Sequence, residues 1–492
     1  MQKYVTCEEF KELRKDFKEK GLKVVHCHGV FDLLHPGHIF HLQESKSMGD
    51  ILVVSITAAK YVNKMPGRPY FSDELRIKSL SCLEFVDYVL LSEAVTAMDI
   101  LDIVQPDYYI KGSEYKVSED DITQNIDKEV ERVRLYGGDV RFTKNDIVFS
   151  STKLLNNNQA SLSPKVFEFL KEFSKKYSFK DIKDVIDRMK NIKILVVGDI
   201  IIDEYIFCSV QGLISKDRTI SGRYQKEEKY LGGSLAVAKH LAGLSDNVTI
   251  CSMIGNDLGV LDNINTDLII DNNYQTIIKR RYIEKRGSRE EYDKLFSINY
   301  LNESDFDRTL FRNRLLNIIK DYDLVVVTDY GHGLIDEDII NILQDNAKYL
   351  SVNCQTNSSN YGMNLITKYS KVNSFSLDEK ELKLATNNNL KKLFKYLNSD
   401  VGWVTHGSNG AIGINTSGTC NVPALTLTVQ DTIGAGDAYF ALVSLCAYLG
   451  VSLEIGTFLG SIAGALISNV LGNSKSVNRI DVLKFASTVM NI

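Results

Sequence analysis

Short apolar segments of strand length alternate with helical patterns in both halves of this chain. Strands that alternate with helices along a sequence form parallel sheets with helices on both faces. The apolar segments lie at 22–27, 51–56, 86–91, 108–110, 194–197, 324–328 and 403–405. The pattern therefore predicts an α/β fold with two three-layer, parallel-sheet domains.

The domain organisation follows from where this pattern breaks. A chain of 492 residues is long enough for two or three domains with separate cores. A run of three asparagines that begins at Asn156 is followed by Lys- and Phe-rich helical stretches with little strand signal. We therefore expect a first domain over residues 1–155, a partly helical linker over 156–190 and a second domain over 191–492.

The charge and composition of the chain indicate which kinds of binding partner to expect. The net charge of −5 and the pI near 6.0 give no reason to expect nucleic acid or an anionic membrane. The 8 cysteines show no CxxC or CxxH spacing, which argues against a zinc site and favours a reducing, cytoplasmic location. The apolar runs 438–453 and 455–471, separated by Glu454, are each shorter than the roughly 20 residues of a membrane span. We expect two buried helices there and no membrane partner.

The segment Asp431-Thr-Ile-Gly-Ala-Gly-Asp437 joins an extended apolar stretch, 422–429, to an apolar helical run that begins at Ala438. Glycines at such a turn leave backbone N–H groups exposed at the positive end of a helix, where a phosphate binds. A carboxylate in the first helical turn, here Asp437, can take a proton from a hydroxyl beside that phosphate. Taken alone, the same residues also describe an ordinary N-capped helix.

Two histidines, His35 and His38, flank Pro36-Gly37 at the start of a predicted helix. Both imidazoles can donate hydrogen bonds to one phosphate, and the helix N-terminus strengthens the attraction. Gly29 and Gly37 let the backbone approach that phosphate. The set favours attack of a phosphate oxygen on the α-phosphorus of a nucleoside triphosphate, a reaction that needs charge stabilisation but no nucleophilic side chain. A zinc site is the rival, but two histidines at this spacing make a poor zinc set.

The segment GVFDLLHPGH, residues 29–38, resembles the signature of the cytidylyltransferase-like nucleotidyltransferases. Three further segments match that family in order: KMPGRP (64–69), KGSEY (111–115) and SSTK (150–153). The resemblance implies a Rossmann-like nucleotidyltransferase domain in which His35 and His38 are catalytic. The nucleotide and phosphate contacts that it implies are Gly29, Phe31, Lys64, Arg68, Lys111, Ser151 and Thr152.

A second series of motifs resembles the ribokinase-like, PfkB-type sugar kinases over residues 191–492. It comprises GDIIID (198–203), Gly232-Gly233, DYGHG (329–333), THG (405–407) and the GAGD turn. The resemblance implies that Asp437 is the base. It also implies sugar contacts from Asp203, Gly232, Gly233 and Asp329, ATP contacts from Thr405 and Gly407, and an anion hole from the amides of Gly434, Ala435 and Gly436. Segments 204–229 and 276–298 alternate like antiparallel strands, which predicts a small β lid over this site.

Both halves together are similar to the bifunctional heptose-phosphate kinase/nucleotidyltransferases of ADP-heptose synthesis, in which the kinase comes first. GDIIIDEY, GGSLAVA and KRRYIEK (279–285) carry this likeness. Three positions depart from the kinase pattern: Ala236 replaces an asparagine, His332 a lysine, and Asp378 the asparagine of an Asn-x-x-Glu motif. The first two leave the identity of the sugar open. Asp378 and Glu381 would still bind Mg²⁺, directly or through water.

The resemblances imply a bifunctional enzyme. One half would phosphorylate a heptose-like sugar or sugar phosphate from ATP and Mg²⁺, and the other would transfer a nucleotidyl group from ATP or CTP to a sugar phosphate, giving a nucleotide sugar for a cell-surface glycan. One alternative is a cytidylyltransferase for a polyol phosphate or other small phosphate ester, fused to an inactive kinase half that senses a ligand. Another is a scaffold in which both folds serve assembly. By analogy with related kinases, we expect a homodimer through the lid.

Overall fold

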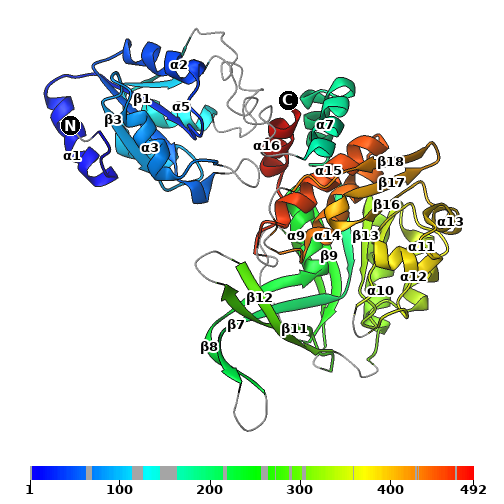
Figure 1. Cartoon of the computed structure of the whole chain (residues 1–492). Coiled ribbons are helices and arrows are strands. Elements are labelled where there is room, and N and C mark those ends of the chain that lie inside the picture. The colour runs from blue at the N-terminus through cyan, green and yellow to red at the C-terminus, as the bar shows by residue number, and fades with distance from the viewer. Residues whose placement is uncertain are drawn as a thin grey trace. The chain divides into compact units, whose positions relative to one another are not determined.

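The chain forms two compact α/β units, Met1–Pro164 with Leu483–Ile492, and Lys165–Val482 (Figure 1). The computed structural model describes residues 3–62, 69–112, 126–143, 163–213, 219–255, 264–271, 273–286, 291–301, 306–357, 360–426, 429, 431–470 and 474–491. Each unit contains its own sheet and its own buried core.

The first unit is built on a parallel, five-stranded sheet with the strand order β3-β2-β1-β4-β5. The strands are β1 (Val24–Gly29), β2 (Ile51–Thr57), β3 (Tyr88–Ser92), β4 (Tyr108–Lys111) and β5 (Asp139–Phe142). The helices are α1 (Cys7–Glu19), α2 (Pro36–Lys46), α3 (Asp73–Ser81), α4 (Met98–Val104) and α5 (Ile126–Leu135).

Alternate residues of these strands enter two cores, one on each face of the sheet. Val24 of β1 packs with Phe10 of α1 and Leu101 of α4, whereas its neighbour Val25 packs with Leu42 of α2. Successive side chains of a strand point to opposite faces, so a sheet covered on both sides needs apolar residues at nearly every position. The continuous apolar segments of the sequence meet this need, and the three-layer prediction is confirmed.

The second unit contains a nine-stranded sheet with the order β10-β9-β6-β13-β14-β15-β16-β17-β18. Its strands are β6 (Lys193–Gly198), β9 (Asn247–Ile254), β10 (Asn265–Ile270), β13 (Leu324–Asp329), β14 (Leu350–Cys354), β15 (Ser374–Asp378), β16 (Val401–Thr405), β17 (Ala411–Asn415) and β18 (Gly418–Val422). The pairs from β10 to β16 are parallel, and the last two strands pair antiparallel.

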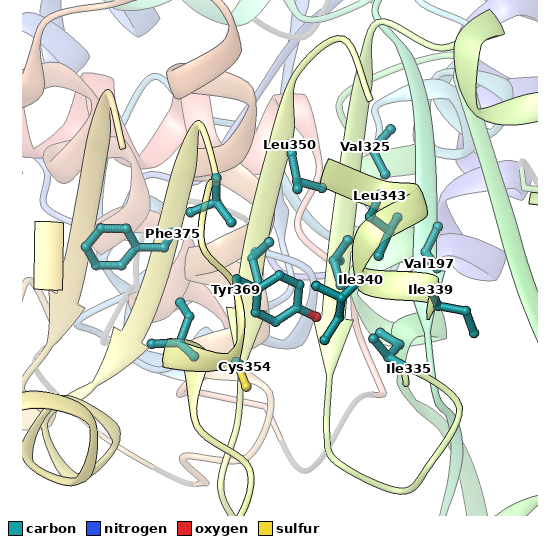
Figure 2. Close-up of a cluster of buried hydrophobic side chains, with 14 of the residues drawn as sticks. Val197, Val325, Ile335, Ile339, Ile340, Leu343, Leu350, Cys354, Tyr369 and Phe375 are labelled. Atoms are coloured by element: carbon teal, nitrogen blue, oxygen red, sulfur yellow. The ribbon is translucent and has the colours of Figure 1, made fainter. Parts of the chain in front are cut away.

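One face of this sheet carries the main hydrophobic core. Figure 2 shows Val197 of β6 and Val325 of β13 beside Ile339 and Leu343 of α11, with Phe375 of β15 further along the sheet. The helices on this face are α10 (Thr309–Ile318), α11 (Glu337–Asn346), α12 (Glu379–Thr386) and α13 (Leu390–Tyr396). The remaining helices of the domain include α9 (Ser234–Ala242), α14 (Ala435–Tyr448) and α15 (Leu453–Ile467).

A separate four-stranded sheet with the order β12-β11-β7-β8 forms the predicted lid. Its strands are β7 (Ile200–Leu213), β8 (Ile220–Gly233), β11 (Ile277–Arg286) and β12 (Glu291–Tyr300). Strand β7 pairs antiparallel with β8 and parallel with β11. Side chains of a strand alternate between faces, so each lid strand presents one set of residues inward and another outward.

The two apolar runs near the C-terminus are the buried helices α14 and α15. A Cβ on Gly460 of α15 would lie 2.6 Å from Val443 of α14, so the glycine permits close packing of the pair. Across the part of the chain that the structure describes, no helix is long and apolar enough to cross a membrane.

Helices α7 (Pro164–Lys176) and α8 (Phe179–Arg188) lie in the segment that we expected to be a partly helical linker. Phe173 of α7 packs against Phe458 of α15, with 4.3 Å between ring centroids. Lys176 forms an ion pair with Glu454 at 2.8 Å. Helix α7 is therefore packed as part of the second unit.

The stretch 422–429 before the glycine turn is only partly paired as a strand, and residues 427 and 428 lie outside the described ranges. Strand β18 ends at Val422, and residues 423–426 belong to no strand. Pro423 has no backbone N–H to donate to a neighbouring strand, which accounts for the end of β18.

Candidate active sites

The first candidate site lies where β1 ends and α2 begins. His35 is the N-cap of α2, and its Nδ1 accepts a hydrogen bond from the backbone N–H of His38 at 3.4 Å. The Nδ1–H of His38 donates to the carbonyl of Leu33 at 3.2 Å. These bonds place the proton of neutral His35 on Nε2, where it can be donated to a phosphate. The rings stack with centroids 3.8 Å apart, and burial lowers the pKa of His35.

The turn between β1 and α2 is fixed by neighbouring groups. Arg76 of α3 is 1% exposed and donates to the carbonyl of Val30 at 2.6 Å. Phe31 has a φ of 46°, and its ring meets the edge of His38 with 5.3 Å between centroids. A Cβ on Gly29 would lie only 3.1 Å from the Phe31 ring. Glycine therefore leaves room for the ring that packs against the catalytic candidate.

Lys111 ends β4, the strand beside β1 at the point where the strand order reverses. Connections leave such a point on opposite faces of the sheet and open a crevice where ligands bind. Lys111 forms an ion pair with Glu129 of α5 at 2.7 Å and lies 4.9 Å from the centroid of the Tyr109 ring. The expected contacts Lys64, Arg68, Ser151 and Thr152 lie outside the described residues and stay predictions.

The second candidate site is centred on the N-terminus of α14. Gly434 is the N-cap with a φ of 80°, and Ala435 begins the helix. Among the described residues outside the first turns of α14, no atom lies within 4 Å of the position that a Cβ on Gly436 would take. The first-turn amides of a helix have no partners within it, and the dipole favours an anion there. This end of α14 has the space and the donors that an anion hole requires.

Asp437 follows in the first turn of α14 and is held by two donors. Its Oδ1 accepts hydrogen bonds from the Tyr330 hydroxyl at 3.1 Å and from the Gln355 amide at 2.9 Å. Burial raises the pKa of Asp437 to about 6, with Asp203 acting in the same direction and the two hydrogen bonds and Lys279 opposing. At neutral pH the carboxylate is ionised, yet its pKa is close enough to accept a proton from a reacting hydroxyl.

The glycine pair of β8 makes room for Asp203 of β7. A Cβ on Gly232 would lie 2.2 Å from Oδ2 of Asp203, and a Cβ on Gly233, at φ 58°, would lie 2.5 Å from the carbonyl of Asp199. Asp203 is 4% exposed and forms an ion pair with Arg281 of β11. The geometry explains both glycines sterically, and their contacts with a sugar stay predictions.

A pocket of about 180 Å³ adjoins these residues and receives side chains of the lid. It is lined by Lys279, Arg281, Ser297, Asn299, Leu301, His332 and Asn357. Lys279 makes no ion pair with any described residue, and its ammonium lies 5.8 Å from the centroid of the Tyr330 ring. Burial lowers the pKa of Lys279, and Asp203 and Asp437 oppose that shift. A half-buried cation that has no ion-pair partner among the described residues and lies near the candidate base suits an anionic group on the ligand.

His332, which stands where the kinase pattern has a lysine, is 8% exposed in this pocket. Burial and, second, Lys279 lower its pKa to about 4, so the imidazole is neutral near pH 7. Its Nε2 is buried and has no hydrogen-bond partner within the described ranges. A neutral imidazole in this position can bind a hydroxyl rather than a phosphate.

The expected Mg²⁺ ligands form a capping box at the start of α12. Asp378 accepts from the N–H of Glu381 at 2.7 Å, and Glu381 accepts from the N–H of Asp378 at 2.8 Å. Burial, then Asp378 and Asp437, raise the pKa of Glu381 to about 8. No cluster of three or more ligating side chains occurs among the described residues. The pair still fits Mg²⁺ that arrives on a nucleotide, because such an ion keeps waters and phosphates as most of its ligands.

Thr405 and Gly407 lie at the carboxyl end of β16, where Thr405 pairs in register with Asp378 of β15. Gly407 has a φ of 55° and open space where a Cβ would lie. Asp329 is 1% exposed, and its Oδ2 accepts a hydrogen bond from Tyr369 at 2.8 Å and pairs with Lys368 at 2.6 Å. Its Oδ1 accepts from the N–H of Gly331 at 3.1 Å, which holds the turn after β13, and its expected contact with a sugar stays a prediction.

Several residues at the second site carried no role in the sequence interpretation. Tyr330 and Gln355 donate hydrogen bonds to the candidate base, Asp437. Lys279 and Arg281 place positive charge in the lining of the pocket. Lys279 and Arg281 are two apart within KRRYIEK, a spacing that puts both on one face of a strand. The shared face of Lys279 and Arg281 could therefore be predicted from the sequence. The hydrogen bond from Gln355 to Asp437 could not, because it joins residues 82 positions apart.

Family comparisons agree with the two halves seen in the structure. Residues 26–157 match the family described as cytidylyltransferase-like, and residues 191–478 match the pfkB family of carbohydrate kinases. The chain belongs to the pfkB carbohydrate kinase family. It carries a cytidylyltransferase-like domain ahead of the kinase domain, as the motifs predict.

Curated relatives match parts of this chain. The bifunctional protein HldE of Nitratiruptor sp. is 36% identical over 133 residues, which is 27% of this chain and 29% of that protein. HldE of Campylobacter jejuni subsp. jejuni serotype O:6 is 25% identical over 315 residues, 59% of this chain and 66% of that protein. Each match thus spans less than two thirds of the relative. Among solved structures, Escherichia coli phosphofructokinase-2 in complex with potassium aligns with 61% of this chain and 99% of its own, at 15% identity and a TM-score of 0.49.

We predict that Tyr330→Phe raises the pKa of Asp437 by about one unit. The hydroxyl donates to the carboxylate, and removing a hydrogen bond to a charged group costs about 1.5–3 kcal/mol, part of which other donors recover. An NMR titration of aspartate carboxyl carbons in the full chain measures the shift. Tyr396→Phe, which removes a hydroxyl bonded to Thr367 on the surface, is the control and should change nothing. An unchanged Asp437 titration in Tyr330→Phe would rule out the role of the hydroxyl.

Proposed function

We propose that this chain is a bifunctional enzyme that phosphorylates a sugar phosphate and also forms a nucleotide sugar. The observation that carries the kinase half is Asp437, with a pKa of about 6, placed in the first turn of α14 beside open amides and a cationic pocket. A sugar hydroxyl would attack the γ-phosphorus of ATP, Asp437 would take its proton, and ADP would leave. The amides of Gly434, Ala435 and Gly436 would stabilise the charge that develops on the transferred group.

The charge of the pocket supports a phosphorylated sugar over a neutral one. Arg281 is already paired with Asp203, whereas Lys279 has no ion-pair partner within the described ranges. A neutral sugar would leave that ammonium desolvated without compensation, which is costly. A phosphate on the substrate would supply the missing negative charge. His332, neutral in the same pocket, would accompany a sugar hydroxyl.

The first unit would catalyse the nucleotidyl transfer. A phosphate oxygen of the sugar phosphate would attack the α-phosphorus of ATP or CTP, and pyrophosphate would leave. His35 and His38, stacked at the N-terminus of α2, would stabilise the charge on the phosphates. Nothing in the described residues favours one base over the other. The resemblance of GDIIIDEY, GGSLAVA and KRRYIEK to the enzymes of ADP-heptose synthesis supports a heptose as the sugar and a cell-surface glycan as the destination.

Magnesium would enter with the nucleotides and supply charge neutralisation on the transferring phosphates. At the kinase site, Asp378 and Glu381 would approach the ion. Its positive charge would favour the ionised form of Glu381, which burial and, second, the charges of Asp378 and Asp437 disfavour. We place both reactions in the cytoplasm, where ATP and CTP are available.

The two activities should be separable by single substitutions in the full chain. Asp437→Asn removes the proton acceptor, so ADP release should fall by at least about 10²-fold while pyrophosphate release persists. His38→Ala removes a charge-stabilising group, so pyrophosphate release should fall by at least about 10²-fold while ADP release persists. Coupled assays with ATP or CTP and a panel of sugar phosphates measure both, and each variant serves as the control for the other.

Two outcomes would reject this assignment. Loss of both activities in either variant, with melting temperature preserved, would refute two independent sites. Absence of ADP release in the parent protein with every sugar, while a sugar still raises the melting temperature, would favour the alternative of a ligand-sensing kinase half. The departures from the kinase pattern at Ala236, His332 and Asp378 motivate that alternative, and the position of Asp437 opposes it.

Lys279→Met tests whether the substrate carries a phosphate. The lost charge-assisted contact, worth about 1.5–3 kcal/mol, should raise the KM for phosphorylated sugars by about 10- to 100-fold and leave unphosphorylated sugars nearly unaffected. Lys285→Met changes the same charge at an exposed position of the same strand and should be neutral. A fall in kcat that is equal for both kinds of sugar would show instead that Lys279 stabilises the transferring phosphoryl group.

We also propose that the chain forms a homodimer through the outer face of the lid. Phe296 and Ile298 of β12 are 55% and 41% exposed, and the Phe296 ring stacks on Tyr282 at 4.4 Å. These residues alternate with Ser297 and Asn299, which line the pocket on the inner face. Exposed apolar side chains gathered on one sheet face are typical of an interaction surface.

Phe296→Lys should therefore convert the dimer to a monomer in sedimentation velocity runs. The reason is that a charge buried without a partner in an apolar interface costs several kcal/mol. Leu310→Lys, at a 66% exposed position of α10 outside the lid, should leave the dimer intact. A parent protein that sediments as a monomer at all concentrations would disprove this interface.

A further inference from the structure

The lid is joined to the turn before α14 by two contacts. Ile433, in that turn, packs against the hydrophobic cluster of the lid that includes Ile283 of β11. Lys294 of β12 forms an ion pair with Asp431, with 2.9 Å between Nζ and Oδ1, and the side chain of Asp431 is 2% exposed. One apolar contact and one ionic contact thus connect the lid with the segment that carries the candidate anion hole.

A β-bulge in β12 brings Lys294 to this face of the lid. Successive pairs in the register of β11 and β12 are Arg281 with Ser297, Tyr282 with Phe296, and Ile283 with Lys294. Leu295 is skipped in this register and is the extra residue of the bulge. In a regular strand, Lys294 would share the outer face with Phe296. The bulge instead puts Lys294 on the inner face with Ser297, which lines the pocket of the second candidate site.

Asp431 transmits the contact from the lid to the backbone. Its Oδ1, the atom that faces Lys294, also accepts a hydrogen bond from the N–H of Ile433 at 3.2 Å. An aspartate that accepts a bond from the amide two residues later forms an Asx turn, which fixes the course of the backbone. Gly434 follows directly as the N-cap of α14. An ionic contact on Asp431 therefore restrains the amides that begin at Gly434.

We propose that Lys294 is a positioning residue for phosphoryl transfer, which holds the anion hole in place through Asp431. The inference rests on the kinase activity proposed above. Donors of an anion hole stabilise the transition state effectively only when they are already held in place before the reaction. The strand pair that lines the pocket also carries Lys294. A ligand that orders the lid would therefore order the anion hole with it, so that sugar and phosphoryl donor would each favour binding of the other.

Lys294→Met should lower the kcat for ADP release by at least about 10-fold, because displaced donors lose part of the about 10²- to 10³-fold that one such group supplies. The KM for the sugar phosphate should change by less than about 3-fold, since Lys294 does not line the pocket. Lys294→Arg keeps the positive charge and should restore most of the kcat.

Lys229→Met is the matched control. Lys229 is a lid lysine of similar exposure, 59% against 51% for Lys294, and it also pairs with a buried carboxylate, Glu204, at 3.0 Å. Glu204 follows Asp203 along β7 and so lies on the opposite face of the lid. This variant should keep the kcat and both KM values of the parent protein.

Asp431→Asn tests whether Lys294 acts through that carboxylate. The asparagine oxygen can still accept from Ile433, so the Asx turn is kept while the ion pair is lost. The kcat should fall as it does in Lys294→Met, and the double variant should fall no further, because both substitutions remove the same interaction. Losses that multiply in the double variant would show that the two residues act independently and would overturn the inference.

Amide hydrogen exchange gives a readout that does not depend on activity. In Lys294→Met, the amides of residues 433–436 should exchange at least about 10-fold faster than in the parent protein, while those of α2 should not change. If the parent protein releases ADP and Lys294→Met keeps its kcat, this inference is wrong and the kinase assignment stands. If the parent protein releases no ADP with any sugar, both are wrong.

Discussion

In each parallel sheet that the structure describes, the carboxyl ends of the parallel strands lie at one edge, and helices such as α2 and α14 begin there. That geometry collects unpaired backbone amides and the positive ends of helix dipoles in one place, which is where phosphate binds most readily. In the first unit the edge carries His35 and His38 at the start of α2, and in the second it carries Gly434 to Asp437 at the start of α14. Both candidate sites are consequences of strand direction before any side chain is considered.

The second site adds a balance of buried charges to this scaffold. Burial, then Asp329, raise the pKa of Asp199 to about 7, while the pKa values of Asp437 and Glu381 are near 6 and 8. Burial disfavours the charged form of each of these carboxyl groups, and it also lowers the pKa of Lys279, the nearby cation. A metal-bound nucleotide would compensate these charges. Its cation would lie near the acidic groups, and its phosphates would bind Lys279 and the amides of α14.

The sequence was sufficient for the layers, the lid and the phosphate turns, because each depends on local patterns: apolar runs, alternation over 276–298, and glycines before helices. It was insufficient where distant segments meet. The orientation of Asp437 by Gln355 and Tyr330, the internal use of Asp329 by Tyr369, and the attachment of α7 to α15 all join residues far apart in the chain. The end of strand pairing at Val422 was not predicted either, because the apolar stretch continues past Pro423, which has no backbone N–H to donate.

The contact between Gly232 and Asp203 has a consequence for how this site can evolve. A Cβ at position 232 would overlap the carboxylate, with only 2.2 Å between them, so no other residue fits while Asp203 keeps its place. Conversely, a smaller residue at position 203 would leave Arg281 without its partner. The residues at these three positions, on the adjacent strands β8, β7 and β11, therefore depend on one another. Descendants of this protein can change one of them only by passing through a poorer fit or by replacing the set together.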